Sequence, residues 1–141
     1  MSYSFSACYP GESETRSKSQ VEFSEIEQVF ESFDWNEAFE KASNIYDNLE
    51  IEPKYGVPFF EIRKMKNDQI LSFTVARNEN FENKILTGHS RPIEETSFFG
   101  LLKKKTRKNE GKLLNEVGDA SKLLTEFHNL EIVDFEALFE K

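Results

Sequence analysis

Cysteine and histidine are scarce in this chain of 141 residues, which has one cysteine, Cys8, and two histidines, His89 and His128. A single thiol cannot close a disulfide within the chain, and zinc sites need several Cys and His ligands at close spacing. Acid pairs such as Glu94-Glu95 and Glu25/Glu27 remain as candidate ligands, but such pairs arise by chance among 26 acids. We therefore expect no metal, no cofactor and a reducing, cytoplasmic compartment.

Long apolar runs are also lacking. No stretch approaches the roughly 20 apolar residues that a membrane-spanning helix needs. The opening residues, MSYSFSACYPGESE, have neither the basic start nor the apolar segment of a secretory signal. The sequence therefore predicts a protein without membrane association.

The motifs of common catalytic and nucleotide-binding sites do not occur in the sequence: GxGxxG, GxxxxGK(S/T), HExxH, GxSxG and the EF-hand loop. A lone thiol without a neighbouring histidine is poor evidence for a nucleophile. His89, in TGHSRP, is expected in a glycine-containing loop, and no sequence signature supplies the carboxylate and oxyanion donors that catalysis there would need. His128 is expected late in a helix, where it meets the helix dipole favourably. We do not expect an enzyme.

Basic residues are few and unevenly placed. The net charge is −8, yet residues 22–61 hold eleven acids against Lys41 and Lys54, a net of 2 − 11 = −9. The segment KKKTRK at 103–108 holds five cations and no acid. It is expected to be a solvated hairpin tip or loop, with phosphate contact or pairing to the acidic segment as alternatives. An acidic surface repels nucleic acid and anionic lipid and attracts basic proteins.

Aromatic residues are abundant, with fourteen Phe, and they predict a core packed with rings. Near the N-terminus, Tyr3, Phe5, Ala7 and Tyr9 alternate with polar or small residues, which is the period of a half-buried strand. Pro10-Gly11 marks a turn, and alternation resumes at 21–23. This pattern predicts an N-terminal hairpin.

Two helices are expected next. Ser24 to Glu27 reads as a capping box, and an apolar stripe follows it at Ile26, Val29, Phe30 and Phe33. A second stripe, Ala38 to Leu49, is out of phase with the first. We therefore place a bend at Asp34-Trp35, with Asp34 capping the second helix.

The remaining pattern predicts an antiparallel meander. The segments FFEIRKM and ILSFTVAR flank KND, FENKILTG adds a third strand, and the Pro- and Gly-rich IEPKYGVP before them is expected to be loop. Residues 90–118 fit either a strand pair around RKNEG or broken helix, and we favour strands. Asp119 and Asp134 are expected to cap two further helices, the first with Leu123, Leu124 and Phe127 inward. The predicted fold class is α+β, an antiparallel β-meander packed against helices as a single domain over 1–141.

The segment FESFDWNEAFE raises the question of function. Its rings fit burial, but its acids are not interleaved with the lysines that usually stabilise an exposed helix; Glu27, for example, is followed by Glu31 one turn later. A solvated face is one interpretation of these acids. The other is a surface for a basic protein, with Trp35 at the bend as an anchor. The candidate partner-binding residues are Glu27, Glu31, Asp34, Trp35, Glu37 and Glu40.

Two segments resemble bacterial immunity proteins, the dedicated inhibitors that accompany contact-dependent or polymorphic toxins: SEIEQVFESFDWNEAFEKA and the strand pair FFEIRK…ILSFTVAR. The small acidic α+β character and the lack of a catalytic motif extend the resemblance, which covers roughly residues 20–90. It identifies no individual functional residue. It implies binding without chemistry, in which an acidic face covers the basic active-site cleft of a toxin, often a nuclease.

Three other functions share these features. An intracellular adaptor or regulatory module would have the same composition. A small hydrolase would use His89. A nucleic-acid binder would use KKKTRK, although the overall negative charge opposes the approach of a polyanion.

Overall fold

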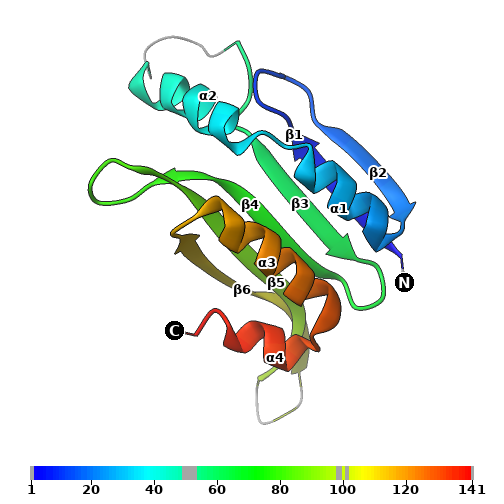
Figure 1. The fold of residues 1–141 in the computed structure, drawn as a ribbon. Helices are drawn as coiled ribbons and strands as arrows, with labels where there is room; N and C mark the ends of the chain where they lie inside the picture. Colours follow the sequence, from blue (N-terminus) through cyan, green and yellow to red (C-terminus); the bar gives the residue numbers. More distant parts are fainter. Residues whose placement is uncertain (1, 49–53, 98–99, 101, 141) are drawn as a thin grey trace.

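The computed structural model describes residues 2–48, 54–97, 100 and 102–140. Within these residues, six antiparallel strands form one sheet in the order β2-β1-β3-β4-β5-β6, and four helices lie together over one of its faces (Figure 1). The strands are β1 (Tyr3–Cys8), β2 (Arg16–Val21), β3 (Phe59–Lys64), β4 (Gln69–Arg77), β5 (Asn83–Ser97) and β6 (Leu102–Leu114), and the helices are α1 (Phe23–Glu31), α2 (Trp35–Asp47), α3 (Val117–Asn129) and α4 (Ile132–Ala137). This arrangement is the predicted α+β fold, a meander covered by helices.

The N-terminal hairpin is confirmed, since β1 pairs with β2 through registers such as Ser6↔Ser17. The capping box predicted at Ser24 is wrong. Helix α1 begins at Phe23, its N-cap is Glu22, and no side chain caps it. Because Phe23 is drawn into the core, the helix starts earlier than the local motif predicts, and Ser24 falls inside the first turn.

The bend between α1 and α2 is confirmed. The Asp34 carboxylate accepts a hydrogen bond of 3.0 Å from the backbone N–H of Glu37, as an N-cap does. The apolar stripe predicted for the first helix is also confirmed: Ile26 and Phe30 are buried on α1, Val29 is half-buried, and Phe33 is buried just beyond the end of the helix.

The predicted strands of the meander are present, but β5 and β6 are longer than expected. The segment TGHSRP lies within β5 rather than in a loop, and RKNEG lies within β6 rather than at a turn. The chain instead reverses between Ser97 and Leu102, where Gly100 adopts a left-handed φ of 87°. The continuous β5–β6 ladder outweighs the local Gly and Asn turn signals.

Helices α3 and α4 form as predicted, with Leu123, Leu124 and Phe127 buried, but their caps were placed wrongly. The N-cap residues are Glu116 and Glu131, so Asp119 and Asp134 lie in the first turns. The Asp119 carboxylate still satisfies a helix end, since it accepts a hydrogen bond from the Glu116 N–H at 3.1 Å.

Rings fill the space between the sheet and the helices, as the Phe content predicts. Phe30 packs edge-on against Phe60 with ring centres 5.4 Å apart, and Phe135 packs against Phe127 at 5.2 Å. The buried aromatic residues are Tyr3, Phe23, Phe30, Phe33, Trp35, Phe60, Phe73, Phe127, Phe135 and Phe139. Among the described helices, none has the length and apolar content needed to cross a membrane.

Candidate partner-binding surface

Helix α1 presents two of the candidate acids at its border with α3. Glu27 and Glu31 lie one turn apart and are exposed, while Phe30 between them is buried. They line a small hollow of about 70 Å³ together with Phe30 and, from α3, Ser121, Leu124 and Thr125. The two carboxylates therefore border a groove between helices.

Helix α2 carries the other candidate acids, Asp34, Glu37 and Glu40, and all three are exposed. Asp34 and Glu37 are joined by the capping hydrogen bond, and Glu40 follows Glu37 by one turn. The structure thus brings the five acids into two groups, one at the α1–α3 groove and one on the first half of α2. In Figure 1, α2 comes directly after α1 within the helix layer.

None of these five acids forms an ion pair within the described part of the chain. The neighbouring acids differ: Glu25 binds Lys18 at 2.7 Å, and Asp47 binds Arg77 at 2.9 Å. Lys41, one turn after Glu37, instead lies 5.2 Å from the centre of the Tyr55 ring. The negative charge on the two groups is therefore left uncompensated by the cations that the structure describes.

Trp35 does not belong to this surface, and its prediction as an exposed anchor is wrong. Its side chain is only 5% exposed, and its ring packs against Phe33 at 4.5 Å and against Phe30 and Phe73. The spacing of Trp35, Ala38 and Ala42, at i, i+3 and i+7, is itself that of a buried helix stripe, and all three residues are buried. This signal was present in the sequence.

The basic run at 103–108 lies entirely in β6, where each of its five cations has an acid nearby, either as a register partner on β5 or in an ion pair. Lys104 is paired in register with Glu95 and Lys105 with Glu94, and Lys103 approaches Glu94 at 3.7 Å. Arg107 binds the Asp68 carboxylate at 2.8 Å. The run is therefore a strand with cross-strand charge compensation, not a solvated loop, and it does not pair with the acids of α1 and α2 within the described residues.

His89 lies in the core, not in an open site. Its Nε2 is 2.9 Å from the Gln69 side-chain oxygen, and the rings of Phe127, Phe135 and Phe139 surround it. The side chain is 2% exposed, and burial lowers the pKa of the imidazole, which favours its neutral form. A substrate cannot reach it without opening the core.

His128 and Cys8 also have structural surroundings. The His128 ring stacks on Phe23 with centres 3.9 Å apart, and its Nδ1 shares a hydrogen bond with the Tyr3 hydroxyl. The Cys8 thiol is buried and donates to the Glu12 carbonyl at 3.4 Å. Burial, and then the nearby Glu12 charge, raise the pKa of this thiol, so it is a poor nucleophile.

A second polar cluster, which has no local sequence signal, holds α4 against the sheet. The Glu136 carboxylate accepts hydrogen bonds from Arg91 on β5 and Lys108 on β6, and these contacts lower its pKa from 4.5 to about 2. Its carboxylate oxygens also lie near those of Glu110 and Glu140, within 4.8 Å. Because two cations already bind Glu136, the cluster is an ion network that fixes a short helix.

No family model matches this chain, and no curated protein or solved structure matches it either.

Proposed function

We propose that this chain is a non-catalytic acidic binding protein, an immunity protein that neutralises a basic toxin by covering its active site. One observation carries the proposal: five exposed carboxylates on α1 and α2 have no cation partner among the described residues. Like charges one helix turn apart, as at Glu27 and Glu31, destabilise a helix by about 0.2 to 0.5 kcal/mol. A basic partner would reverse that penalty on binding.

The expected partner is a protein with a concentrated positive surface. A nuclease domain fits this description, because it carries cations to hold the phosphates of its substrate. Opposite potentials raise association rates by about 10- to 10³-fold. The side chains that then slow dissociation must come from residues other than Trp35, which is buried.

The α1–α3 groove supplies a place for such contacts. Phe30 and Leu124 give it an apolar floor, and Glu27 and Glu31 give it an acidic border. A lysine or arginine from the partner would lay its aliphatic stem on the floor and its charge against the carboxylates. This adds an apolar contribution to the electrostatic one.

A charge-reversal experiment tests the surface. The triple variant Glu27→Lys, Glu31→Lys, Glu37→Lys is compared with Glu14→Lys, Glu79→Lys, Glu140→Lys, which makes the same change in net charge at exposed acids elsewhere. The partner is first identified by capture from the source cell, and its association with each purified variant is measured at low and moderate salt. We expect the first variant to lose most binding and the second to retain it. Equal losses in both would show that net charge, not this surface, governs binding.

A second function, an intracellular adaptor, uses the same surface. Gene neighbourhood and a growth assay separate the two. If the gene directly upstream encodes a toxin, co-expression of this chain should restore growth, and the first triple variant should not. If no toxin gene lies nearby and the captured partner is harmless to the cell, the adaptor is favoured.

A further inference from the structure

Phe81 is an exception to the ring-filled core. Of the phenylalanines that the structure describes, it alone is exposed, and its relative exposure is 81%. It lies in the turn between β4 and β5, which extends beside α2 in Figure 1. Single exposed apolar residues are common on protein surfaces, so exposure alone indicates no function. The backbone at this position provides the second observation.

Phe81 has a backbone conformation that phenylalanine rarely adopts. Its φ is +60°, in the left-handed region. Its N–H donates to the Asn78 carbonyl at 3.1 Å, and the residue that completes such a hairpin turn in the left-handed region is usually glycine. A larger side chain is strained there because its Cβ atom lies too close to the following carbonyl oxygen. The fold therefore retains a strained aromatic residue at an exposed position.

Asn78 fixes the shape of this turn. Its side-chain oxygen accepts hydrogen bonds from the N–H groups of Asn80 and Glu82, both at 3.0 Å. Its own N–H donates to the Glu82 carbonyl at 3.0 Å, and its side-chain amide donates to the Glu82 carboxylate at 3.2 Å. Because the backbone under Phe81 is already ordered, the ring loses little conformational entropy when it binds a partner.

The base of the turn is attached to α2, the helix that carries three of the acids proposed for binding. On β5, the Asn83 side chain donates to the Phe39 carbonyl at 3.3 Å and to the Ser43 hydroxyl at 2.6 Å. On β4, Arg77 binds the Asp47 carboxylate at 2.9 Å. Both strands that meet at the turn are thus fixed to this helix, and the exposed ring stands beside the acidic surface.

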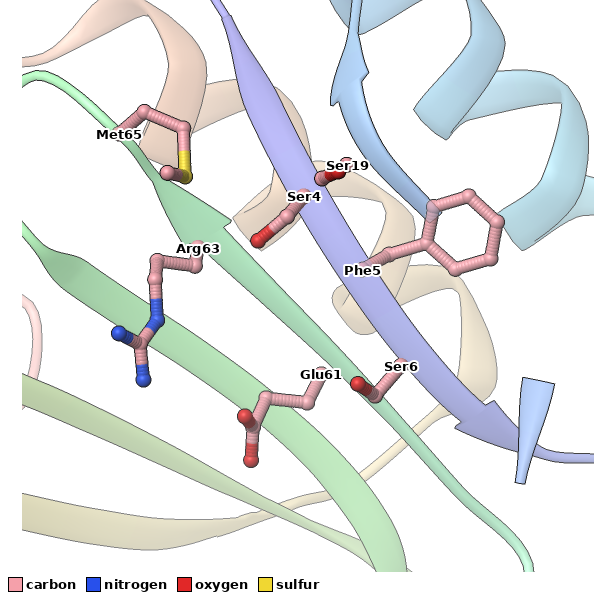
Figure 2. Close-up of a pocket in the computed structure, with 7 residues that line it drawn as sticks. All are labelled: Ser4, Phe5, Ser6, Ser19, Glu61, Arg63 and Met65. Carbon is pink, nitrogen blue, oxygen red and sulfur yellow. The ribbon is translucent and has the colours of Figure 1, made fainter. Parts of the chain in front are cut away.

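The other large apolar side chains that are exposed in the described part of the chain lie elsewhere. Met65 borders a hollow on the sheet face opposite the helices, among serines and the charged side chains of Glu61 and Arg63 (Figure 2). Leu86 and Leu113 point to that same face, because their neighbours along the strands are buried under the helices. The remaining ones are on β6, α3 and α4: Leu102, Val117 and Val133.

We propose that Phe81 is the aromatic anchor of the partner interface and enters an apolar pocket on the basic protein that the acids of α1 and α2 attract. This inference rests on the proposed function, which supplies the charge of the partner. A ring held on an ordered backbone buries a large apolar area at a small entropic cost, and aromatic residues of this kind dominate the binding energy of many interfaces. Retained backbone strain is typical of such positions. Phe81 thus supplies the slow dissociation that the buried Trp35 cannot.

Phe81→Asn tests the anchor, because asparagine adopts the left-handed region more easily than phenylalanine does. Its melting temperature should equal that of wild type or exceed it by up to about 5 °C. Its rate of dissociation from the captured and then purified partner should rise by about 30-fold or more, while the association rate changes by less than about 2-fold. Val133→Asn is the matched control, since Val133 is 78% exposed on α4. Both of its rates should match wild type.

Salt dependence distinguishes the anchor from the acidic surface. The faster dissociation of Phe81→Asn should be the same at low and moderate salt. The Glu27→Lys, Glu31→Lys, Glu37→Lys variant should instead associate more slowly, and most clearly at low salt. If that variant binds as wild type does and Phe81→Asn dissociates faster, the acidic surface fails and the anchor stands. The reverse result overturns the anchor alone.

Three results would overturn the anchor. A melting temperature of Phe81→Asn clearly below wild type would show that the ring supports the fold. An unchanged dissociation rate would show that the ring does not contact the partner. The third is the absence of any protein that wild type captures and Phe81→Asn releases faster. The control variant with Glu79→Lys changes a charge in this turn but keeps the ring, so it should dissociate as slowly as wild type.

Discussion

The ion network at Glu136 gives the sharpest stability prediction. Glu136 is 8% exposed and receives hydrogen bonds from both Arg91 and Lys108, which lower its pKa from 4.5 to about 2. One pKa unit corresponds to about 1.4 kcal/mol, so this fall has an upper limit of roughly 3 kcal/mol. The Arg91 and Lys108 side chains are 27% and 40% exposed, and water screens part of the interaction. We therefore expect the Glu136→Gln variant to be about 2 kcal/mol less stable at pH 7.

The sign of the pH dependence follows from the direction of the shift. Because the carboxylate has a lower pKa in the folded state than in the unfolded state, its stabilisation is complete above about pH 4.5. It is lost as the pH falls from there toward about 2. The difference between wild type and Glu136→Gln should therefore be largest near neutral pH and vanish in strong acid.

Thermal unfolding followed by circular dichroism measures this difference. At pH 7 the variant should melt about 5 to 10 °C below wild type, and the two curves should converge as the pH is lowered. Glu140→Gln is the control, because Glu140 belongs to the same carboxylate cluster but is exposed and forms no ion pair within the described residues. It should change the melting temperature by no more than about 2 °C. An equal melting temperature for wild type and Glu136→Gln at pH 7, or a gap that stays constant with pH, would refute this account of α4.

Three further predictions concern residues that the sequence singled out. Trp35→Ala should lower the free energy of unfolding in urea by about 3 to 5 kcal/mol because it empties a packed core site, and a loss below about 1 kcal/mol would contradict burial of the ring. Asp34→Ala should lower it by about 1 kcal/mol through loss of the α2 cap, whereas Asp34→Asn should be nearly neutral; similar losses in both would show that the charge matters, not the cap. Cys8 should react with a thiol reagent only after denaturation, and rapid modification of the native protein would show that the thiol is accessible.

The spacing of apolar residues along the chain, together with capping residues, predicted much of the helix and strand pattern. The alternation in Tyr3 to Tyr9 and in the two strands of the meander identifies one buried face, which is enough to place those strands. Asp34 was predicted as a cap because its oxygen satisfies a backbone N–H three residues later, a purely local contact. Local signals failed where long-range pairing overrides them, as at RKNEG, which the β5–β6 ladder holds extended despite its turn-forming residues.

Some features of the candidate surface could likewise be predicted from the sequence, and others could not. The excess of acids on α1 and α2 was visible in the sequence, because helical spacing alone separates Glu27 and Glu31 from the buried Ile26 and Phe30. That these acids lack a cation partner among the described residues could not be predicted, since each possible partner lies on another element. The burial of Trp35 was available from its spacing with Ala38 and Ala42, but its packing against Phe73 was not.

The sequence by itself determined the fold class, the ring-filled core and the concentration of negative charge. These features follow from which residues are present and how the apolar and charged ones are spaced along the chain. Tertiary structure decided which charges remain uncompensated. It brought Arg91, Lys108 and Glu136 together across as many as 45 positions, set the cations of 104 and 105 against the acids of 94 and 95, and left one face of the sheet open. These outcomes depend on strand order and register, which are fixed only when the helices cover one face of the sheet and the whole core packs at once.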